Sequence, residues 1–145
     1  MKEIKTKKGE ISIVDDEVHE IAKNHKWRLV SRYLATTING KTLYLHHLVI
    51  GQPLNGLVVD HINRNRFDNR KENLRICTQS ENRMNSVIAK HNSTGFKGVV
   101  KRASGYTATI SKKHLGYFKT AEEAGKAYNE ESKKLYGEYA FPNTI

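Results

Sequence analysis

The sequence LVVDHINRNRFDNRKENLRICTQSENRMN, at residues 57–85, changes from apolar to polar and then to a helix-starting pattern. The apolar run at its beginning ends in Asp60-His61, and a loop rich in Asn and Arg follows. TQSE at 78–81 predicts a helix start, because a capping Thr and a Glu three residues later can satisfy each other's unpaired amides. We therefore expect a strand, a loop and a helix to bring an acid, an imidazole and the amide of Asn82 together.

These three side chains suit a metal ion beside a general base. The Asp60 carboxylate and the Asn82 carbonyl oxygen are the ligand types that Mg²⁺ or Mn²⁺ prefers. His61, with an ordinary pKa of about 6.5, can take a proton from water near neutral pH. Neighbouring side chains of a regular strand point to opposite faces, so Asp60 and His61 can share a site only where the strand ends or kinks. Each residue alone is explained as readily by a surface or strand-end position, and the combination favours a site.

The stretch at 58–85 resembles the HNH endonucleases of bacteriophages and mobile introns, which are built on a strand-strand-helix metal site. The resemblance implies that His61 is the base that activates water and that Asp60 beside it is a metal ligand. Asn73, in the sequence ENLR, would be the central Asn of the motif, whose amide ties the loop together. The third motif position is here Asn82, an "HNN" variant of the phage branch, and would be the second protein ligand.

Composition limits the kind of protein and its partners. The chain has 145 residues, which suits one ordinary domain or two small modules. Its 25 Lys and Arg against 15 acids give a net charge of +10 and favour a polyanion such as nucleic acid, although a ribosomal protein or a membrane-surface binder also fits. The single Cys77 excludes an intramolecular disulfide and a cysteine-held zinc.

The N-terminal segment and the apolar runs indicate the expected location of the protein in the cell. MKEIKTKKGE at 1–10 lacks the apolar core of a signal peptide, and no run is long enough to span a bilayer. We therefore expect a soluble protein of the cytoplasm, inside a bacterial host cell, with no membrane partner.

The segment before the motif predicts short strands and one helix. We expect residues 1–10 to be frayed, EISIV at 10–14 to form a strand, and a helix to run from Asp15 or Asp16 to about Lys23. The residues expected to face inward from this helix are Val18, Ile21 and Ala22.

A hairpin is predicted next. Residues 28–37 and 41–45 read as paired strands joined by Asn39-Gly40, and Trp27 before them is expected to pack. The second strand is expected to continue through residues 45–49. Alternation along a strand would place His46 and His47 on opposite faces, so we do not expect them to bind one metal together. By the same resemblance, His46 packs or forms a hydrogen bond behind the site.

The last third of the chain predicts a separate module. The helix that starts after Thr78 is expected to end near Ile88 or Ala89, and the polar AKHNSTG that follows places the boundary between domains 1–90 and 91–145. Strands are expected at 96–101, 106–110 and 114–118. TAEE at 120–123 is a second capping box, opening a helix to about Tyr136. Its expected inward stripe is Ala124, Ala127, Tyr128 and Leu135. The fold class is thus α+β, with a three-stranded antiparallel sheet packed on one helix after the nuclease module.

This tail resembles the plant ethylene-response-factor (ERF) DNA-binding domain, which also occurs fused to HNH nucleases. The matching residues are FKGV, LGYF, EEAGKAY and YGEYAFPN, within Asn92–Asn143. The resemblance implies that the sheet docks in the major groove of duplex DNA. Val100, Ser104 and His114 depart from the plant pattern, so only the docking mode is carried over. The implied contacts are Lys97, Arg102, Tyr106 and Lys112, followed by Lys101 and Thr109; the alternative for each Lys is a solvated surface charge.

The leading interpretation is a metal-dependent DNA endonuclease of the phage homing type, acting on double-stranded DNA as a monomer. Arg70 and Arg75 in the loop are expected near the phosphates, with plain surface charge as the alternative. A non-catalytic, sequence-specific DNA-binding regulator that uses the ERF-like domain is the second interpretation, and an RNA-binding or ribosome-associated protein is the third. The complete set of Asp60, His61, Asn73 and Asn82 favours the first.

Overall fold

The computed structural model describes residues 1–145 and divides the chain into two compact units, Met1–Gln79 and Ser80–Ile145. Each unit mixes strands and helices, so the predicted α+β class is confirmed. This division assigns most of the helix after Thr78 to the second unit. The assignment of 1–90 to a nuclease domain and 91–145 to a DNA-binding domain stays a prediction.

The first unit begins with an antiparallel hairpin of β1 (Lys2–Lys5) and β2 (Ile11–Val14). The expected frayed N-terminus is therefore wrong. The chain turns back because the Thr6 hydroxyl accepts hydrogen bonds from the amides of Lys8 and Glu10, and Gly9 adopts a φ of 97°. Ile4 from β1, 4% exposed, then enters the core of the unit.

Helix α1 (Asp16–Ala22) follows β2 directly, close to the predicted range. Trp27 is buried, as expected, and its indole N–H donates to the carbonyl of Ala22 at 2.8 Å, which satisfies one carbonyl at the helix end. Ile21, expected to face inward, is instead exposed. The buried core of the unit is Ile4, Val14, Ala22, Trp27, Leu34 and Leu45.

A three-stranded sheet follows, in the order β3 (Arg28–Val30), β4 (Tyr33–Ile38) and β5 (Lys41–Tyr44). The hairpin at Asn39-Gly40 is confirmed, with φ values of 50° and 75° at the turn. The expected single strand at 28–37 is wrong, because Ser31 and Arg32 also adopt positive φ, 47° and 76°, and make a second tight turn.

The strand expected to continue through 45–49 is wrong as well. Those residues form helix α2 (Leu45–Ile50), which ends at Gly51 with a φ of 84°. Leu45 lies in the core and Leu48, three residues on, packs against it, which is the spacing of a helix face rather than of a strand.

The predicted strand-strand arrangement at the motif is confirmed. Strand β6 (Leu57–His61) pairs antiparallel with β7 (Leu74–Thr78), and a short 3₁₀ turn η1 (Lys71–Asn73) precedes β7. The loop between them is fastened to the edge of β2. The Ile13 amide donates to Phe67 O at 2.8 Å, and the Asn69 amide donates to Ile13 O at 2.9 Å. The N-terminal hairpin therefore fixes the shape of the loop beside the motif.

Helix α3 (Gln79–Met84) is shorter than predicted. It ends because other groups take its last carbonyls. The Met84 carbonyl accepts from the amide of Phe141 at 3.2 Å and from the ammonium of Lys97 at 2.9 Å. These partners come from far along the chain and could not be read from the local pattern.

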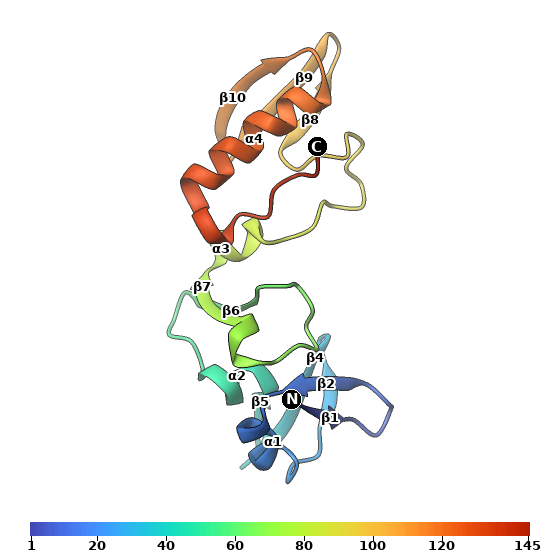
Figure 1. Ribbon diagram of the computed structural model, residues 1–145, viewed down its shortest axis with the longest axis vertical. Coiled ribbons are helices and arrows are strands. Elements are labelled where there is room, and N and C mark those ends of the chain that lie inside the picture. The colour runs from blue at the N-terminus through green and yellow to red at the C-terminus, as the bar shows by residue number, and fades with distance from the viewer. The chain divides into compact units, whose positions relative to one another are not determined.

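The rest of the second unit is a sheet packed on one helix, as predicted. Strands β8 (Val99–Arg102), β9 (Gly105–Ile110) and β10 (Lys113–Phe118) form an antiparallel sheet in the order β10-β9-β8. Helix α4 (Ala121–Tyr136) lies along one face of this sheet (Figure 1), and Val99, Ala108 and Ala124 are the buried core between them. A last 3₁₀ turn, η2 (Gly137–Tyr139), follows the helix.

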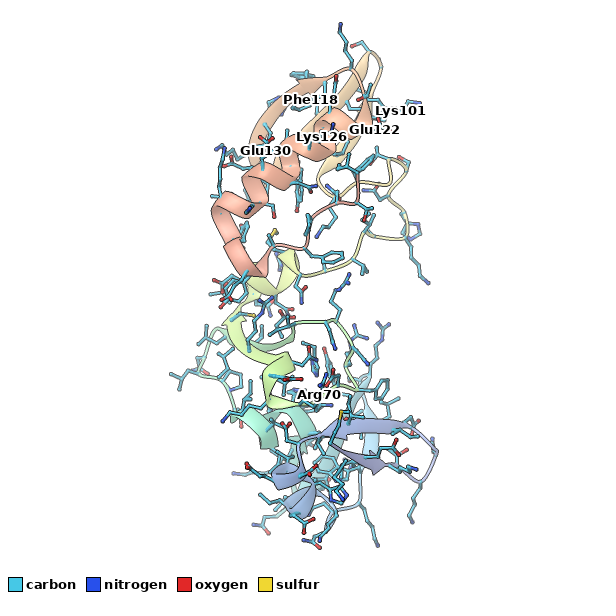
Figure 2. The ribbon with its side chains drawn as sticks, in the orientation of Figure 1. Arg70, Lys101, Phe118, Glu122, Lys126 and Glu130 are labelled. Carbon is cyan, nitrogen blue, oxygen red and sulfur yellow. The ribbon has the colours of Figure 1, made fainter.

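The predicted capping box at the start of α4 is confirmed, with both reciprocal hydrogen bonds between Thr120 and Glu123. Glu122, Lys126 and Glu130 recur at intervals of four along the exposed side of this helix (Figure 2). Leu135, expected in the inward stripe, is exposed, and Ser132 is buried in its place. No helix of the structure is long and apolar enough to cross a bilayer.

Candidate active site

Asp60 and His61 lie at the end of β6, and each is only 5% exposed. The strand ends there as expected. The chain turns at once, because the amide of Arg64 donates to His61 O at 2.8 Å and Arg64 has a φ of 65°. Asp60 and His61 are thus both buried at the end of β6, where each is still paired in register with β7.

The loop after His61 is held by asparagine side chains. The Asn73 amide group accepts from the backbone N–H of Asn63 at 2.9 Å and donates to the Asn63 side chain and to Asp68 O. The side chain of Asn63 accepts from the amide of Asn65, whose own side chain accepts from Phe67. Asn side chains replace the backbone pairing that an irregular loop lacks, which accounts for the Asn-rich composition.

The contacts of His61 include aromatic rings and the side-chain amide of Asn69. Its Nε2 lies 3.1 Å from Asn69 Oδ1. The ring stacks on Tyr33 with centroids 6.0 Å apart and meets His46 edge-on at 5.7 Å. Burial lowers the pKa of His61 below its ordinary value, opposed by the hydrogen bond to Asn69 and by the charge of Asp60. The imidazole is therefore neutral near neutral pH, the state that a general base requires.

His46 lies behind His61 and is nearly buried. Burial, followed by the charges of His47 and His61, lowers its pKa to about 3. The ring stacks on Tyr44 with an interplanar angle of 8° and meets Tyr33 edge-on. It packs as a neutral ring among aromatic side chains.

Arg70, in the loop, and Arg75, on β7, are each paired with an acid. Arg75 donates to Asp60 Oδ2 through Nε at 2.9 Å and through Nη2 at 2.8 Å, and the two residues face each other across β6 and β7. Arg70, labelled in Figure 2, holds both carboxylate oxygens of Asp68 at 2.8 Å. That hydrogen bonding raises the pKa of Arg70 and lowers the pKa of Asp68. Both guanidinium groups order the site, and their expected contact with phosphates stays a prediction.

The metal site was predicted from Asp60 and Asn82. Asp60 belongs to the first unit, and Asn82 lies on α3 in the second, so their convergence stays a prediction. No three His, Cys, Asp or Glu side chains come close enough together to hold a metal ion. A carboxylate and an amide oxygen fit Mg²⁺ nonetheless, because this ion commonly binds through one or two protein oxygens and completes its shell with water and phosphate.

The residues predicted to contact DNA lie at different places on the sheet of β8, β9 and β10. Cross-strand partners share a face, and Lys101 and Tyr106 lie on the face of Val99 and Ala108, which α4 covers. The opposite face is open except at Thr107, which is 3% exposed. It carries Val100, Arg102, Thr109, His114 and Tyr117, all exposed.

Two further predicted contacts lie outside these faces. Lys112 is exposed at the turn between β9 and β10, with a φ of 69°. The ammonium of Lys97 donates to Met84 O at 2.9 Å and to Ser86 O at 3.0 Å, and it lies over the ring of Phe141. The Lys97 contacts hold chain segments of the second unit together and would compete with a phosphate.

Two residues of the site were missed by reasoning from the sequence. Asn69 and Ser12 are 1% and 0% exposed, and the Asn69 side chain donates to Ser12 Oγ at 2.8 Å. The only available signal for Asn69 was its place in the Asn-rich loop. Ser12 carried none, because the pairing joins residues separated by 57 positions.

Comparisons with known proteins point to the family that the motif resembles. Residues 44–84, from the end of β5 through α3, match the HNH endonuclease family. The chain is also 29% identical over 148 residues to a protein of Acanthamoeba polyphaga mimivirus named "Uncharacterized HNH endonuclease L560", an alignment that covers 95% of this chain and 77% of that protein. No solved structure matches the chain significantly. The segment over the motif is thus similar to the HNH endonuclease family, and the chain as a whole is similar to a distant viral protein of that name.

Proposed function

We propose that this protein is a metal-dependent endonuclease of the phage homing type, which hydrolyses a phosphodiester bond in duplex DNA. The observation that carries the proposal is the buried Asp60-His61 pair at the end of β6, beside a loop held by Asn73, inside the segment that matches the HNH endonuclease family.

In this proposal His61 is the general base and Asp60 and Asn82 are the protein ligands of Mg²⁺ or Mn²⁺. His61 takes a proton from a water molecule, whose oxygen attacks the phosphorus. The P–O3′ bond breaks, and the products are a 5′-phosphate and a 3′-hydroxyl that takes a proton from solvent. The bound ion would supply stabilisation of negative charge on the phosphate and the leaving oxygen. Asn73 acts by holding the loop rather than by touching the reacting atoms.

DNA binding is proposed for the second unit, by analogy with the ERF-like sheet. The open face of β8, β9 and β10 presents Arg102, Thr109, His114 and Tyr117, with Lys112 at its end. A cation, hydroxyl and ring groups on one accessible sheet face can contact phosphates and base edges. Lys101 and Tyr106 lie on the face that packs against α4, so we expect them to contribute less to DNA binding than the residues of the open face. One catalytic site per chain is consistent with a monomer that nicks one strand.

The test is nicking of supercoiled plasmid DNA with Mg²⁺, comparing the wild-type chain with His61→Ala and with His91→Ala as the matched control. His91 is exposed, outside the motif, so its substitution should leave nicking unchanged. We expect His61→Ala to slow cleavage by about 10²- to 10⁴-fold, the usual contribution of a general base. Equal nicking by His61→Ala would refute its role, and metal-independent binding without cleavage on any DNA would favour the regulator instead.

A further inference from the structure

The hydrogen bond to Asn69 bears on which ring nitrogen of His61 carries the proton. His61 Nε2 and Asn69 Oδ1 are 3.1 Å apart, and both residues are almost fully buried. A neutral imidazole carries its proton on only one nitrogen, so which nitrogen is basic depends on which one donates to a neighbour.

The partners of Asn69 fix the orientation of its amide group. Asn69 Nδ2 lies 3.1 Å from Arg66 O and 2.8 Å from Ser12 Oγ. A backbone carbonyl can only accept, so the atom facing it must be the –NH₂ group. Rotating the amide by half a turn would set two carbonyl oxygens against each other in a buried place, at a cost of about 1–3 kcal/mol for each unsatisfied group. Asn69 therefore presents its oxygen to His61.

Ser12 completes the chain of hydrogen bonds in one direction. Its hydroxyl lies 2.8 Å from Phe67 O, which can only accept, so the Ser12 proton is used there and Ser12 Oγ accepts from Asn69. The backbone is held at the same place, since the Asn69 amide donates to Ile13 O and the Ile13 amide to Phe67 O. Strand β2 thus fixes both the main chain and the side chain of Asn69.

We infer that Asn69, held by Ser12 on β2, is a positioning residue that keeps the His61 proton on Nε2 and leaves Nδ1 as the nitrogen that accepts a proton. The inference deepens the proposed function and rests on it for the catalytic consequence. It also gives the N-terminal hairpin a part in catalysis, although β2 lies outside the segment that matches the HNH endonuclease family.

The test uses the full chain labelled with ¹⁵N-histidine and long-range ¹H–¹⁵N correlation spectra, which distinguish the two neutral tautomers of an imidazole. In the wild-type chain at mildly alkaline pH, we expect His61 to show a protonated Nε2 and an unprotonated Nδ1. Asn69→Leu, which removes the acceptor at nearly constant volume, should give a mixture of tautomers. Asn24→Leu is the matched control, because Asn24 is exposed just after α1 and its side chain donates a hydrogen bond to Glu20 O of that helix.

Kinetics separate positioning from simple loss of structure. We expect Asn69→Leu to lower kcat for plasmid nicking by about 10- to 100-fold, less than removal of the base itself, with KM for DNA unchanged. Ser12→Ala should have the same kind of effect at smaller size. If Asn69→Leu does not fold, as judged by circular dichroism, the spectra of Ser12→Ala and of the wild-type chain decide.

Either of two results would overturn the inference. One is a wild-type spectrum with the His61 proton on Nδ1. The other is an unchanged tautomer and unchanged kcat in folded variants of Asn69 and Ser12. Failure of the proposed function looks different, since His61→Ala would then nick as fast as the wild-type chain while the tautomer measurement still reports on Asn69.

Discussion

His46 and His61 share one cluster of rings with Tyr33, and burial depresses the pKa of each imidazole. Both are therefore neutral at the pH where a nuclease works, but they differ in what they touch. His61 lies within hydrogen-bonding distance of the side-chain amide of Asn69, in the loop between β6 and β7, whereas His46 stacks on Tyr44. In the proposed function, the same residue type thus serves as a base in one position and as a packing ring in the other.

The low pKa of His46 predicts a loss of stability in acid. In the folded chain its pKa is about 3, whereas an unfolded His has about 6.5. Between these values the unfolded state binds more protons, so the free energy of unfolding falls as the pH is lowered through that window, by about 1 kcal/mol per pH unit. Denaturant unfolding at pH 7 and pH 5 measures the effect. His46→Phe keeps a ring and should reduce the dependence, while His91→Phe should not; an equal slope in all three chains would contradict the assignment.

The Asp60-Arg75 pair predicts that substitutions at these two residues have coupled effects on the free energy of unfolding. Arg75 is mostly buried and places two hydrogen bonds on one oxygen of Asp60. Arg75→Met should lower the free energy of unfolding by on the order of 3 kcal/mol, because it strips a buried carboxylate of its cation. The double variant with Asp60→Asn should lose less than the two single losses added together. Additive losses, measured by urea unfolding, would show that the pair does not act as a unit.

At the scale of elements, the sequence indicated the structure well wherever local chemistry decides it. Asn39-Gly40, the capping box at Thr120 and the strand that ends at His61 all depend on neighbouring residues. The failures have distant causes. Helix α2 forms where a strand was expected because its Leu45 and Leu48 pack on the core, and α3 stops where Lys97 and Phe141 take the carbonyl of Met84.

Gly98 gives an element-scale prediction with a close control. It has a φ of 70°, and a Cβ placed there would lie 2.4 Å from Thr109 O and 2.2 Å from the Tyr128 ring. Gly95 has a φ of 76° with nothing within 4 Å of such a Cβ. Gly95→Ala should therefore cost only the left-handed backbone strain, about 1–2 kcal/mol. Gly98→Ala adds a clash that moves β9 or Tyr128.

Thermal unfolding of the two alanine variants measures this difference. We expect Gly98→Ala to lower the melting temperature clearly more than Gly95→Ala, with the chemical-shift changes in NMR spectra concentrated in β8, β9 and α4. Equal losses in the two variants would contradict a clash between a side chain at Gly98 and Thr109 or Tyr128.

At the scale of the whole molecule, two small units divide the work proposed for this protein. Asp60, His61, the loop after them and the hairpin that orients Asn69 lie in the first unit, whereas Asn82 and the open sheet face lie in the second. Asp60, His61 and Asn73 could be proposed as site residues from the sequence because the motif spacing is local. Asn69 and Ser12 could not, since their pairing depends on β2 meeting the loop across 57 positions.

The division of work predicts that DNA affinity and catalytic rate can be changed separately. Arg102 is exposed on the open face of the sheet of β8, β9 and β10, whereas Lys126 is exposed on α4, which packs on the other face of that sheet (Figure 2). Arg102→Ala should weaken binding to duplex DNA and, if it meets a phosphate, reduce the slope of log affinity against log salt by about 1. Lys126→Ala removes the same charge and should change neither quantity as much.

Fluorescence anisotropy with a labelled duplex across a salt series, beside single-turnover nicking at saturating DNA, measures both quantities in the same variants. We expect Arg102→Ala to bind more weakly and to cleave at the wild-type rate once bound, because the Asp60-His61 pair is unchanged. Tyr117→Ala should behave likewise with an unchanged salt slope, since its ring, 79% exposed, can stack without neutralising a phosphate. Equal losses for Arg102→Ala and Lys126→Ala would mean that net charge, and not the open sheet face, carries the affinity.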